Sequence, residues 1–171
     1  MLIMLTARGL NIMKLFSHEF ISDLKDRANA NERKRQHLNI HENYSDPCQC
    51  LFNAIQPNSY IRPHRHLLDS RNEILLAVHG LMAVIIFDNL GTITNIAKIG
   101  SEKYKSSANI LIEITPGVWH TVISLEQGSI LLEVKPGPFI VHLAKEYAPW
   151  APKEGSRFAL NYHHKLVATI Q

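Results

Sequence analysis

The sequence has few of the features that cross-link, anchor or export a protein. Its only two cysteines, Cys48 and Cys50, are one residue apart and cannot join distant parts of the chain. No apolar run reaches the roughly 18 residues of a transmembrane helix. The apolar segment Met1–Leu5 has no basic flank and is too short for a signal peptide, and Met13 is an alternative start. We therefore expect a cytoplasmic protein under reducing conditions.

An excess of positive charge is also missing. The 18 lysines and arginines outnumber the 15 aspartates and glutamates only slightly, for a net charge of +3 with histidine neutral. A nucleic-acid-binding domain usually carries a dense basic face, and no helix-turn-helix pattern is present. With 171 residues, 46% of them hydrophobic, the chain is long enough for one domain with its own core. We expect a small-molecule partner rather than nucleic acid or a membrane.

One helix is predicted near the N-terminus. Ser17 can cap it, and Glu19 lies in the first turn, where an acidic side chain is favourable to the helix dipole. The apolar residues at helical spacing are Phe20, Ile21, Leu24 and Ala28. The basic run Arg33-Lys34-Arg35 follows, and we interpret it as the solvated end of this helix.

From Cys48 onward, short β-like runs alternate with turn signals such as Pro57-Asn58, Gly80 and Pro116-Gly117. The predicted strands are Cys50–Ile55, Ser59–His66, Glu73–Val78, Leu81–Phe87, Thr92–Ile99, Ile110–Ile114, His120–Leu125 and Ser129–Lys135. Because no helical pattern separates them, they predict an antiparallel sandwich or barrel.

The chain after Lys135 is irregular, since four prolines remove backbone donors there. We expect it to wrap around the barrel, and Phe158–Ile170 fits either a last strand or a short helix. The single domain is therefore divided into an N-terminal extension and helix (1–45), a barrel (46–140) and a C-terminal wrap (141–171).

Four residues near the predicted strand ends have the chemistry of a metal site. His64 and His66 are two apart in a predicted strand, so their imidazoles project from the same face. Glu73 begins an apolar run in which a carboxylate needs a counter-charge, and a tight turn precedes His120. Three imidazoles and a carboxylate suit one divalent Fe, Mn, Ni, Co or Zn ion. On spacing alone, the alternative is four unrelated residues.

The same residues resemble the two motifs of the cupin superfamily, which here read His64-x-His66, Glu73 and Gly80, then Pro116-Gly117-x-x-His120. In that family the three histidines and the glutamate bind one metal ion. Six residues separate His66 from Glu73, where most cupins have three or four, so a longer loop is expected. The resemblance implies an all-β fold, a cupin-type double-stranded β-helix (jelly-roll barrel) with an N-terminal helix.

Several further blocks of the sequence resemble the WbuC family of cupin-fold metalloproteins. The similarity extends from about Phe20 to Gly155. The blocks are Arg35, Asn39, His41, the run Ser59–His66, Phe87-Asp88-x-x-Gly91, Trp119-His120, Glu133–Pro138 and Ala148–Gly155. This resemblance implies a bacterial cytoplasmic protein associated with the synthesis of O-antigen or another surface polysaccharide. It also places Asn39, His41 and Tyr60 among substrate-binding residues. Because cupin-like domains commonly pair through strand edges, we expect a homodimer.

Four other side chains are candidates for substrate binding. Arg62 shares a predicted strand face with His64 and can hold a carboxylate or phosphate, or it can form an outward ion pair. Glu133 and Lys135 share a face, which lines the barrel or faces solvent. Trp119 either packs in the core or stacks on a sugar ring.

The leading functional hypothesis is a metal-dependent enzyme acting on a sugar, sugar nucleotide or related small molecule. An isomerase or epimerase, a lyase and a dioxygenase all fit such a centre, and no catalytic residue is assigned. The alternative is a non-catalytic protein that uses the metal to bind or sense a small molecule. A metal-free epimerase would need a lone histidine base and a tyrosine acid. It is disfavoured because this sequence keeps the complete set of four candidate metal ligands.

Overall fold

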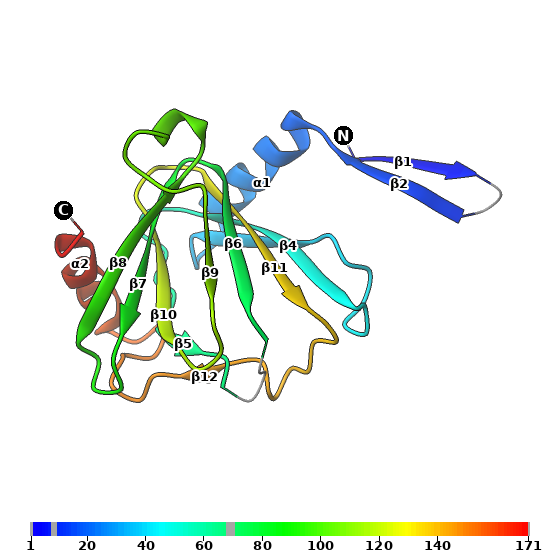
Figure 1. The fold of residues 1–171 in the computed structure, drawn as a ribbon. Helices are drawn as coiled ribbons and strands as arrows, with labels where there is room; N and C mark the ends of the chain where they lie inside the picture. Colours follow the sequence, from blue (N-terminus) through cyan, green and yellow to red (C-terminus); the bar gives the residue numbers. More distant parts are fainter. Residues whose placement is uncertain (1, 8–9, 68–70, 171) are drawn as a thin grey trace.

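The computed structural model describes residues 2–7, 10–67 and 71–170. Its centre is a pair of five-stranded antiparallel sheets that face each other (Figure 1). The first sheet has the order β3 (Arg35–Asn39), β4 (Cys48–Ile55), β11 (Ser129–Pro136), β6 (Glu73–His79) and β9 (Leu111–Ile114). The second has the order β12 (Glu146–Tyr147), β5 (His64–Arg65), β10 (Trp119–Ser124), β7 (Leu81–Phe87) and β8 (Ile93–Gly100).

The order of the strands identifies the fold. Early strands pair with late ones, since β4 lies beside β11 and β5 beside β10, and the chain crosses repeatedly between the two sheets. This nested antiparallel pairing is the double-stranded β-helix, or jelly roll. The predicted all-β, cupin-type fold with a helix near the N-terminus is confirmed.

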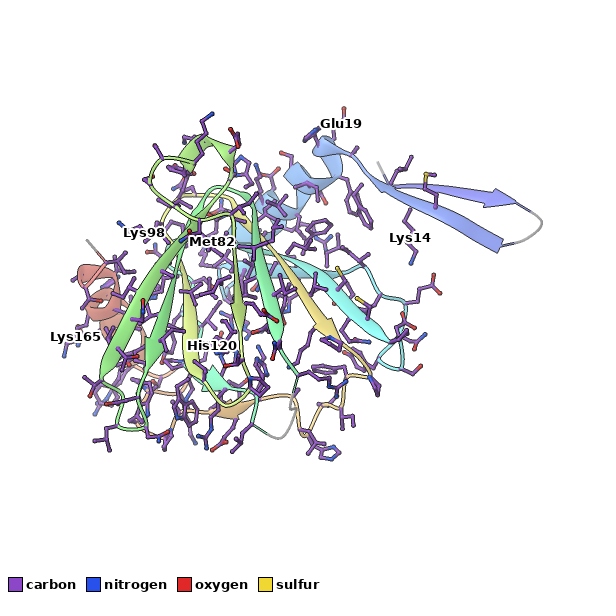
Figure 2. The ribbon with its side chains drawn as sticks, viewed as in Figure 1. Lys14, Glu19, Met82, Lys98, His120 and Lys165 are labelled. Carbon is purple, nitrogen blue, oxygen red and sulfur yellow. The ribbon has the colours of Figure 1, made fainter. Side chains whose placement is uncertain are left out.

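Apolar side chains from the two inner faces form the central core. They are Ile55, Leu75, Ala77, Met82, Val84, Ile99, Ile114, Val122 and Leu131. Alternation along each strand sends every second residue into this layer. In Figure 2, Met82 lies in one half of the barrel and His120 toward the other end, so the apolar core and the polar site occupy different parts of the interior.

Two helices cover the outer faces of the sheets. Helix α1 (His18–Ala30) begins at Ser17, whose hydroxyl accepts a hydrogen bond from the Phe20 N–H at 3.2 Å, as its sequence predicted. Its buried Leu24 and Ala28 pack on the outer face of the first sheet. Helix α2 (Ala159–Ala168) packs Leu166 against the second sheet, so the C-terminal segment is a helix rather than a strand. A short 3-10 helix, η1, spans Glu102–Tyr104.

The N-terminal region contains strands that the sequence did not predict. β1 (Leu2–Ala7) and β2 (Leu10–Phe16) form an antiparallel hairpin that extends away from the barrel in Figure 1. Strand β3 also lies within the segment predicted as extension, yet it forms the edge of the first sheet beside β4. Within the described residues, no helix has both the length and the apolar character needed to cross a membrane.

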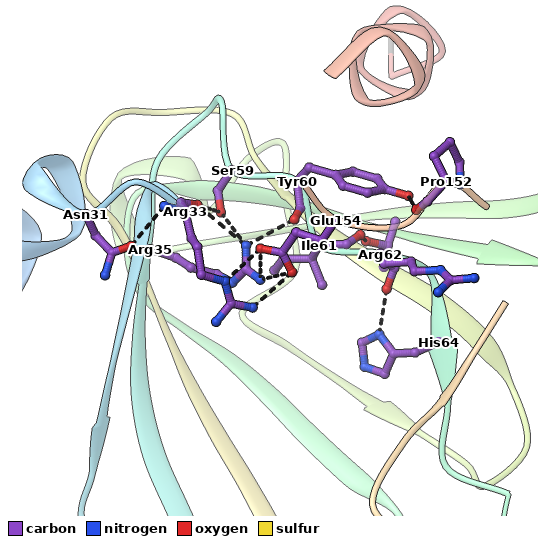
Figure 3. Close-up of polar contacts among 11 residues, drawn as sticks. Asn31, Arg33, Arg35, Ser59, Tyr60, Ile61, Arg62, His64, Pro152 and Glu154 are labelled. Atoms are coloured by element: carbon purple, nitrogen blue, oxygen red, sulfur yellow. Dashed lines mark hydrogen bonds and ion pairs between the residues drawn. The ribbon is translucent and has the colours of Figure 1, made fainter. Parts of the chain in front are cut away.

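The predicted strand Ser59–His66 is wrong for most of its length, because only β5, His64–Arg65, is regular. The residues before His64 are held by hydrogen bonds from side chains rather than by backbone pairing with a neighbouring strand. The guanidinium of Arg35 donates to the Ser59 hydroxyl at 3.2 Å and to the Tyr60 carbonyl at 3.0 Å (Figure 3). Pro63 then removes one backbone donor, so regular pairing begins only after it.

The basic run follows the end of α1 as predicted, and Lys34 donates to the Asn29 carbonyl of its last turn at 2.7 Å, but the two arginines are not merely solvated. Arg33 and Arg35 both bind the carboxylate of Glu154, with contacts of 2.7 to 2.9 Å, and Arg35 is 7% exposed (Figure 3). These ion pairs join the end of α1 to the C-terminal wrap. Sequence reasoning missed them because the partner is more than a hundred residues away.

The Glu154 ion pairs predict a pH-dependent stability. Burial tends to raise the pKa of Glu154, but Arg33 and Arg35 together lower it to about 2. Since the ordinary pKa is 4.5, their stabilisation is complete above that pH and is lost as the pH falls toward 2. We expect Glu154→Gln to lower the free energy of unfolding at pH 7 by about 2 kcal/mol, allowing for solvent screening. Urea denaturation between pH 3 and pH 7 measures this.

A matched control is Glu102→Gln, which removes an exposed carboxylate that lies 3.0 Å from Lys105. Exposed pairs contribute little, so the stability of this variant should stay close to that of the wild type. Equal stability of Glu154→Gln and the wild type at pH 7 would contradict the role given to Glu154.

Candidate metal centre

Three histidines meet where β5 pairs with β10. His64 and His120 are directly opposite each other in the register of the two strands, and His66 follows just after β5. Their ring centroids are 4.5 Å apart for His64 and His120, 5.2 Å for His64 and His66, and 5.5 Å for His66 and His120. The side chains are 5%, 5% and 1% exposed for His64, His66 and His120. The strand pairing thus gathers three buried imidazoles.

Each imidazole is oriented by a main-chain carbonyl. The Nδ1 atom of His64 lies 3.1 Å from the Arg62 carbonyl oxygen, and that of His120 lies 2.9 Å from the Val118 carbonyl oxygen. The Nδ1 atom of His66 contacts the Ala144 carbonyl oxygen. A carbonyl can only accept, so each Nδ1 carries the hydrogen and each Nε2 presents a lone pair.

The free nitrogens converge. One ligand atom from each histidine lies within 4.8 Å of the other two, which is close enough to hold one metal ion. The Nε2 atom of His66 is buried and has no hydrogen-bond partner among the described residues. A buried polar atom without a partner is costly, and a bound cation would satisfy it.

Glu73 adds a carboxylate to the group. It is the first residue of β6, is 3% exposed, and places Oε2 at 3.4 Å from His66 Nε2 and 3.3 Å from His120 Nε2. Because Nδ1 carries the hydrogen in both histidines, Oε2 of Glu73 faces two nitrogen lone pairs. Such an arrangement is stable when a cation lies between the ligands.

The surroundings of the three histidines add a second carboxyl group and a lysine. Burial, followed by the charge of Lys145, lowers the pKa of His64 well below its ordinary value, so this imidazole is neutral at neutral pH. Burial and the nearby Glu73 raise the pKa of Glu133 to about 8. At neutral pH the Glu133 carboxyl is therefore protonated and can donate a hydrogen bond.

Three small cavities surround this centre, and Glu133 and Lys145 line all of them. A cavity of about 30 Å³ lies against His64, Glu73 and His120, on the side of the apolar core. A second, of about 70 Å³, extends past Arg62 to the arginine pair bound by Glu154. A third, of about 160 Å³, extends from His66 across the inner face of the first sheet. We call this third cavity the β4 pocket.

The residues that line the β4 pocket come mainly from β3, β4, β11 and the C-terminal wrap. They are His37, Asn39, His41, Tyr44, Gln49, Leu51, His66, Glu133, Lys135, Phe139 and Lys145. The predicted substrate residues Asn39, His41, Glu133 and Lys135 are all among them. Glu133 and Lys135 therefore face the interior, the first of the two alternatives left open by their strand position.

Arg62 lies beside the metal ligands but is partly engaged. It lines the second cavity with His64, and its Nη2 donates to the Ala148 carbonyl at 2.6 Å. Its guanidinium carbon is 5.4 Å from the centroid of the Tyr147 ring. The Nε atom is buried and has no hydrogen-bond partner among the described residues, so it is left for a ligand.

Two predicted substrate residues lie elsewhere, and the structure corrects both. Trp119 precedes His120 in β10 and so projects from the outer face, where it is buried against Trp150. Its indole N–H donates to the Asn89 side chain at 3.0 Å. Tyr60 donates its hydroxyl to the Pro152 carbonyl at 2.9 Å and lines a different surface hollow. Both side chains bind the C-terminal region or pack against it.

Sequence reasoning missed three contributors to the site. The Ala144 carbonyl orients His66, but a main-chain atom leaves no residue-type signal. Lys145 follows Ala144 in the irregular wrap, where the sequence does not distinguish a lysine that lines a site from one that faces solvent. Gln49 is 6% exposed, and its strand position opposite Lys135 could have been found only from the register of β4 and β11.

Comparisons with known families, curated proteins and solved structures give information on the fold and little on the function. A family model described as a domain of unknown function (DUF6016) matches residues 16–99, just under half of the chain. The search of curated proteins gave no match.

Among solved structures, oxalate decarboxylase from Bacillus subtilis at pH 4.6 has 18% identity and a TM-score of 0.49, covering 66% of this chain and 27% of that one. Oxalate decarboxylase from Lactobacillus farciminis, in a formate complex, has 20% identity and a TM-score of 0.47, covering 66% and 30%. The chain thus spans less than a third of these enzymes. Strand order and site together define a cupin-type jelly roll with three histidines placed to hold a metal ion.

The geometry predicts about one divalent transition metal ion per chain. Replacing two of the four ligands in His64→Ala/His66→Ala should lower metal content at least tenfold, because chelation is lost. Elemental analysis of the purified proteins measures this. The control His142→Ala/His164→Ala removes two exposed histidines and should keep full content. Full occupancy in the first variant would exclude histidine ligation at this site.

Proposed function

We propose that this protein is a metal-binding cupin that holds one divalent ion through His64, His66, Glu73 and His120. The observation that carries the proposal is the fixed orientation of the three imidazoles, whose Nδ1 atoms all contact main-chain carbonyls. This leaves every Nε2 to face the same point, beside the buried carboxyl group of Glu73. An N₃O donor set of this kind suits Fe(II), Mn(II), Ni(II), Co(II) or Zn(II).

We further propose that the metal centre serves an enzyme acting on a sugar, a sugar nucleotide or a related oxygen-rich molecule. When bound, the ion would supply Lewis-acid or redox chemistry to such a ligand. The chain itself supplies binding groups around it: the Arg62 guanidinium in one cavity, and Lys145 and the Glu133 carboxyl at the junction of all three. Similarity to the WbuC family supports a place in bacterial surface-polysaccharide metabolism.

The decisive experiment is turnover by metal-loaded protein. The purified chain, loaded in turn with each of the five ions, would be incubated with sugar nucleotides, free sugars and small hydroxy acids, and products would be followed by proton NMR. Conversion that is absent from metal-free protein and from His120→Ala supports the enzyme. Metal-dependent binding with no conversion of any compound would favour the alternative, a non-catalytic binding or sensing protein.

The Arg62 side chain allows ligand binding to be tested separately from metal binding. It lies against the centre, whereas the exposed Arg157 lies over the Phe158 ring beside helix α2. Arg62→Ala should keep full metal content, because only its main-chain carbonyl orients His64. It should weaken an anionic ligand by about 1.5–3 kcal/mol, the range for a charge-assisted hydrogen bond.

Elemental analysis and calorimetry measure the two quantities, with Arg157→Ala as the control that changes neither. Loss of metal in Arg62→Ala would mean that this side chain supports the centre itself. Unchanged affinity for every anionic ligand that the wild type binds would place Arg62 outside the binding site.

The homodimer also stays a proposal. Support comes from the N-terminal hairpin, which extends from the barrel and exposes Met13 and Leu15 of β2. An isolated two-stranded hairpin is marginal in water, so a covering partner would stabilise it. Light scattering at micromolar concentration should give twice the mass of 19.4 kDa, and a mass of one chain would contradict pairing.

A further inference from the structure

The β4 pocket contains two buried polar atoms that have no hydrogen-bond partner among the described residues. One is the side-chain oxygen of Gln49 and the other is Nε2 of His41. Buried polar atoms are nearly always paired in folded proteins, so two such atoms in one pocket point to a ligand or ordered water.

The hydrogen bonds of Gln49 establish which of its amide atoms is free. Its nitrogen lies within 3.3 Å of the carbonyl oxygens of Asn43, Tyr44 and Asp46, which can only accept. The nitrogen must therefore face that loop, and the unpaired atom is the oxygen. Gln49 thus offers the pocket a hydrogen-bond acceptor.

His41 offers a second unpaired atom. Its Nδ1 lies 2.9 Å from the Cys50 carbonyl oxygen and 3.1 Å from the Cys50 nitrogen, so contacts within the chain already engage this side of the ring. Nε2 is buried and has no hydrogen-bond partner among the described residues. A group that can both donate and accept satisfies Nε2 in either tautomer of the ring.

Beside these polar atoms stands an apolar wall. The rings of Tyr44 and Phe139 pack 5.0 Å apart, and the His41 ring is 6.2 Å from that of Tyr44. Leu51 completes the lining, and Tyr44 is 53% exposed at the rim, where an incoming molecule would meet it. Aromatic faces of this kind pack well against the C–H groups of a ring.

We propose that the β4 pocket receives the ring of a neutral monosaccharide unit, with hydroxyl groups at Gln49 and His41 and its C–H face against Tyr44 and Phe139. A hydroxyl both donates and accepts, so one class of group satisfies both unpaired atoms. A carboxylate or a phosphate dianion, although Lys135 and Lys145 in the lining would attract it, has no hydrogen to donate to the Gln49 oxygen. An apolar ring would leave both atoms unpaired.

This inference rests on the proposed function, because His66 lines the same pocket and so places the ring beside the metal centre. It adds that the sugar ring, rather than an anionic group, occupies the β4 pocket. An anionic substituent on the same ligand would instead extend toward Arg62 in the neighbouring cavity.

The test uses metal-loaded protein and a panel of neutral sugars: glucose, galactose, mannose, rhamnose and N-acetylglucosamine. Saturation-transfer NMR would detect binding, and titration would give the affinity. We expect at least one sugar to bind, with the strongest transfer to ring protons on one face. Cyclohexane-carboxylate, an anionic ring without hydroxyls, should bind at least tenfold more weakly.

Three variants then test the pocket itself. Tyr44→Ala removes an exposed ring and should weaken the sugar at least fivefold, while Phe158→Ala, an equally exposed ring beside helix α2, should leave it unchanged. His41→Asn can keep a contact to the Cys50 main chain but loses Nε2, and Gln49→Met loses the amide oxygen. Each should weaken the sugar about fivefold or more, because one hydrogen bond is lost.

Metal content and thermal unfolding measured in every sample separate the two proposals. Wild-type protein that retains metal but binds no sugar of the panel would overturn the monosaccharide inference and leave the metal centre standing. Sugar binding that is unaffected in folded Tyr44→Ala and His41→Asn would also overturn it. Absence of metal from the wild type, with sugar binding intact, would instead contradict the proposed function alone.

Discussion

The hydrogen bond from each imidazole Nδ1 to a main-chain carbonyl is the interaction on which the site depends. Two of these carbonyls belong to the residue two positions before the histidine, Arg62 for His64 and Val118 for His120. The third is Ala144, far along the chain in the C-terminal wrap. Without that contact His66 could rotate, and its Nε2 would not be directed toward the other two. The wrap is therefore part of the metal centre, although it contributes no ligand side chain.

Contacts that attach the wrap to the barrel cluster around β5. The Ala148 N–H donates to the Pro63 carbonyl at 2.9 Å, and Arg65 binds Glu146 on the outer side. Further along, Glu154 binds the arginine pair at the end of α1. Because these attachments flank His64 in β5 and follow Ala144 closely in the wrap, they fix the position of the carbonyl that orients His66 relative to the strand that carries His64. The stability of the wrap and the geometry of the centre are thus coupled.

The inner face of the first sheet changes character along its length. Leu75, Ile55 and Leu131 pack in the apolar core, whereas Glu133, Lys135 and Gln49 lie beyond them at the open end. Register explains the change, since Leu51 is opposite Glu133 and Gln49 is opposite Lys135. A step of two residues along β4 or β11 therefore passes from the apolar core to the polar pocket. A barrel closed at one end by aliphatic side chains can in this way carry ionisable groups at the other without exposing its core.

The sequence by itself determined the local elements and the ligand set. Alternating apolar residues and turn signals predicted most strands, Ser17 and the helical spacing predicted α1, and spacing picked out His64, His66, Glu73 and His120 as candidate ligands, of which the structure brings the three histidines together. Only the tertiary structure decided the partners of Arg33 and Arg35, the coil before Pro63, the outward position of Trp119 and the entry of Lys145 and Gln49 into the site. Each of these depends on contacts between residues far apart in the chain or on strand register. Periodicity and composition indicate which face of its own helix or strand a residue occupies. They do not indicate which residues of other elements that face contacts.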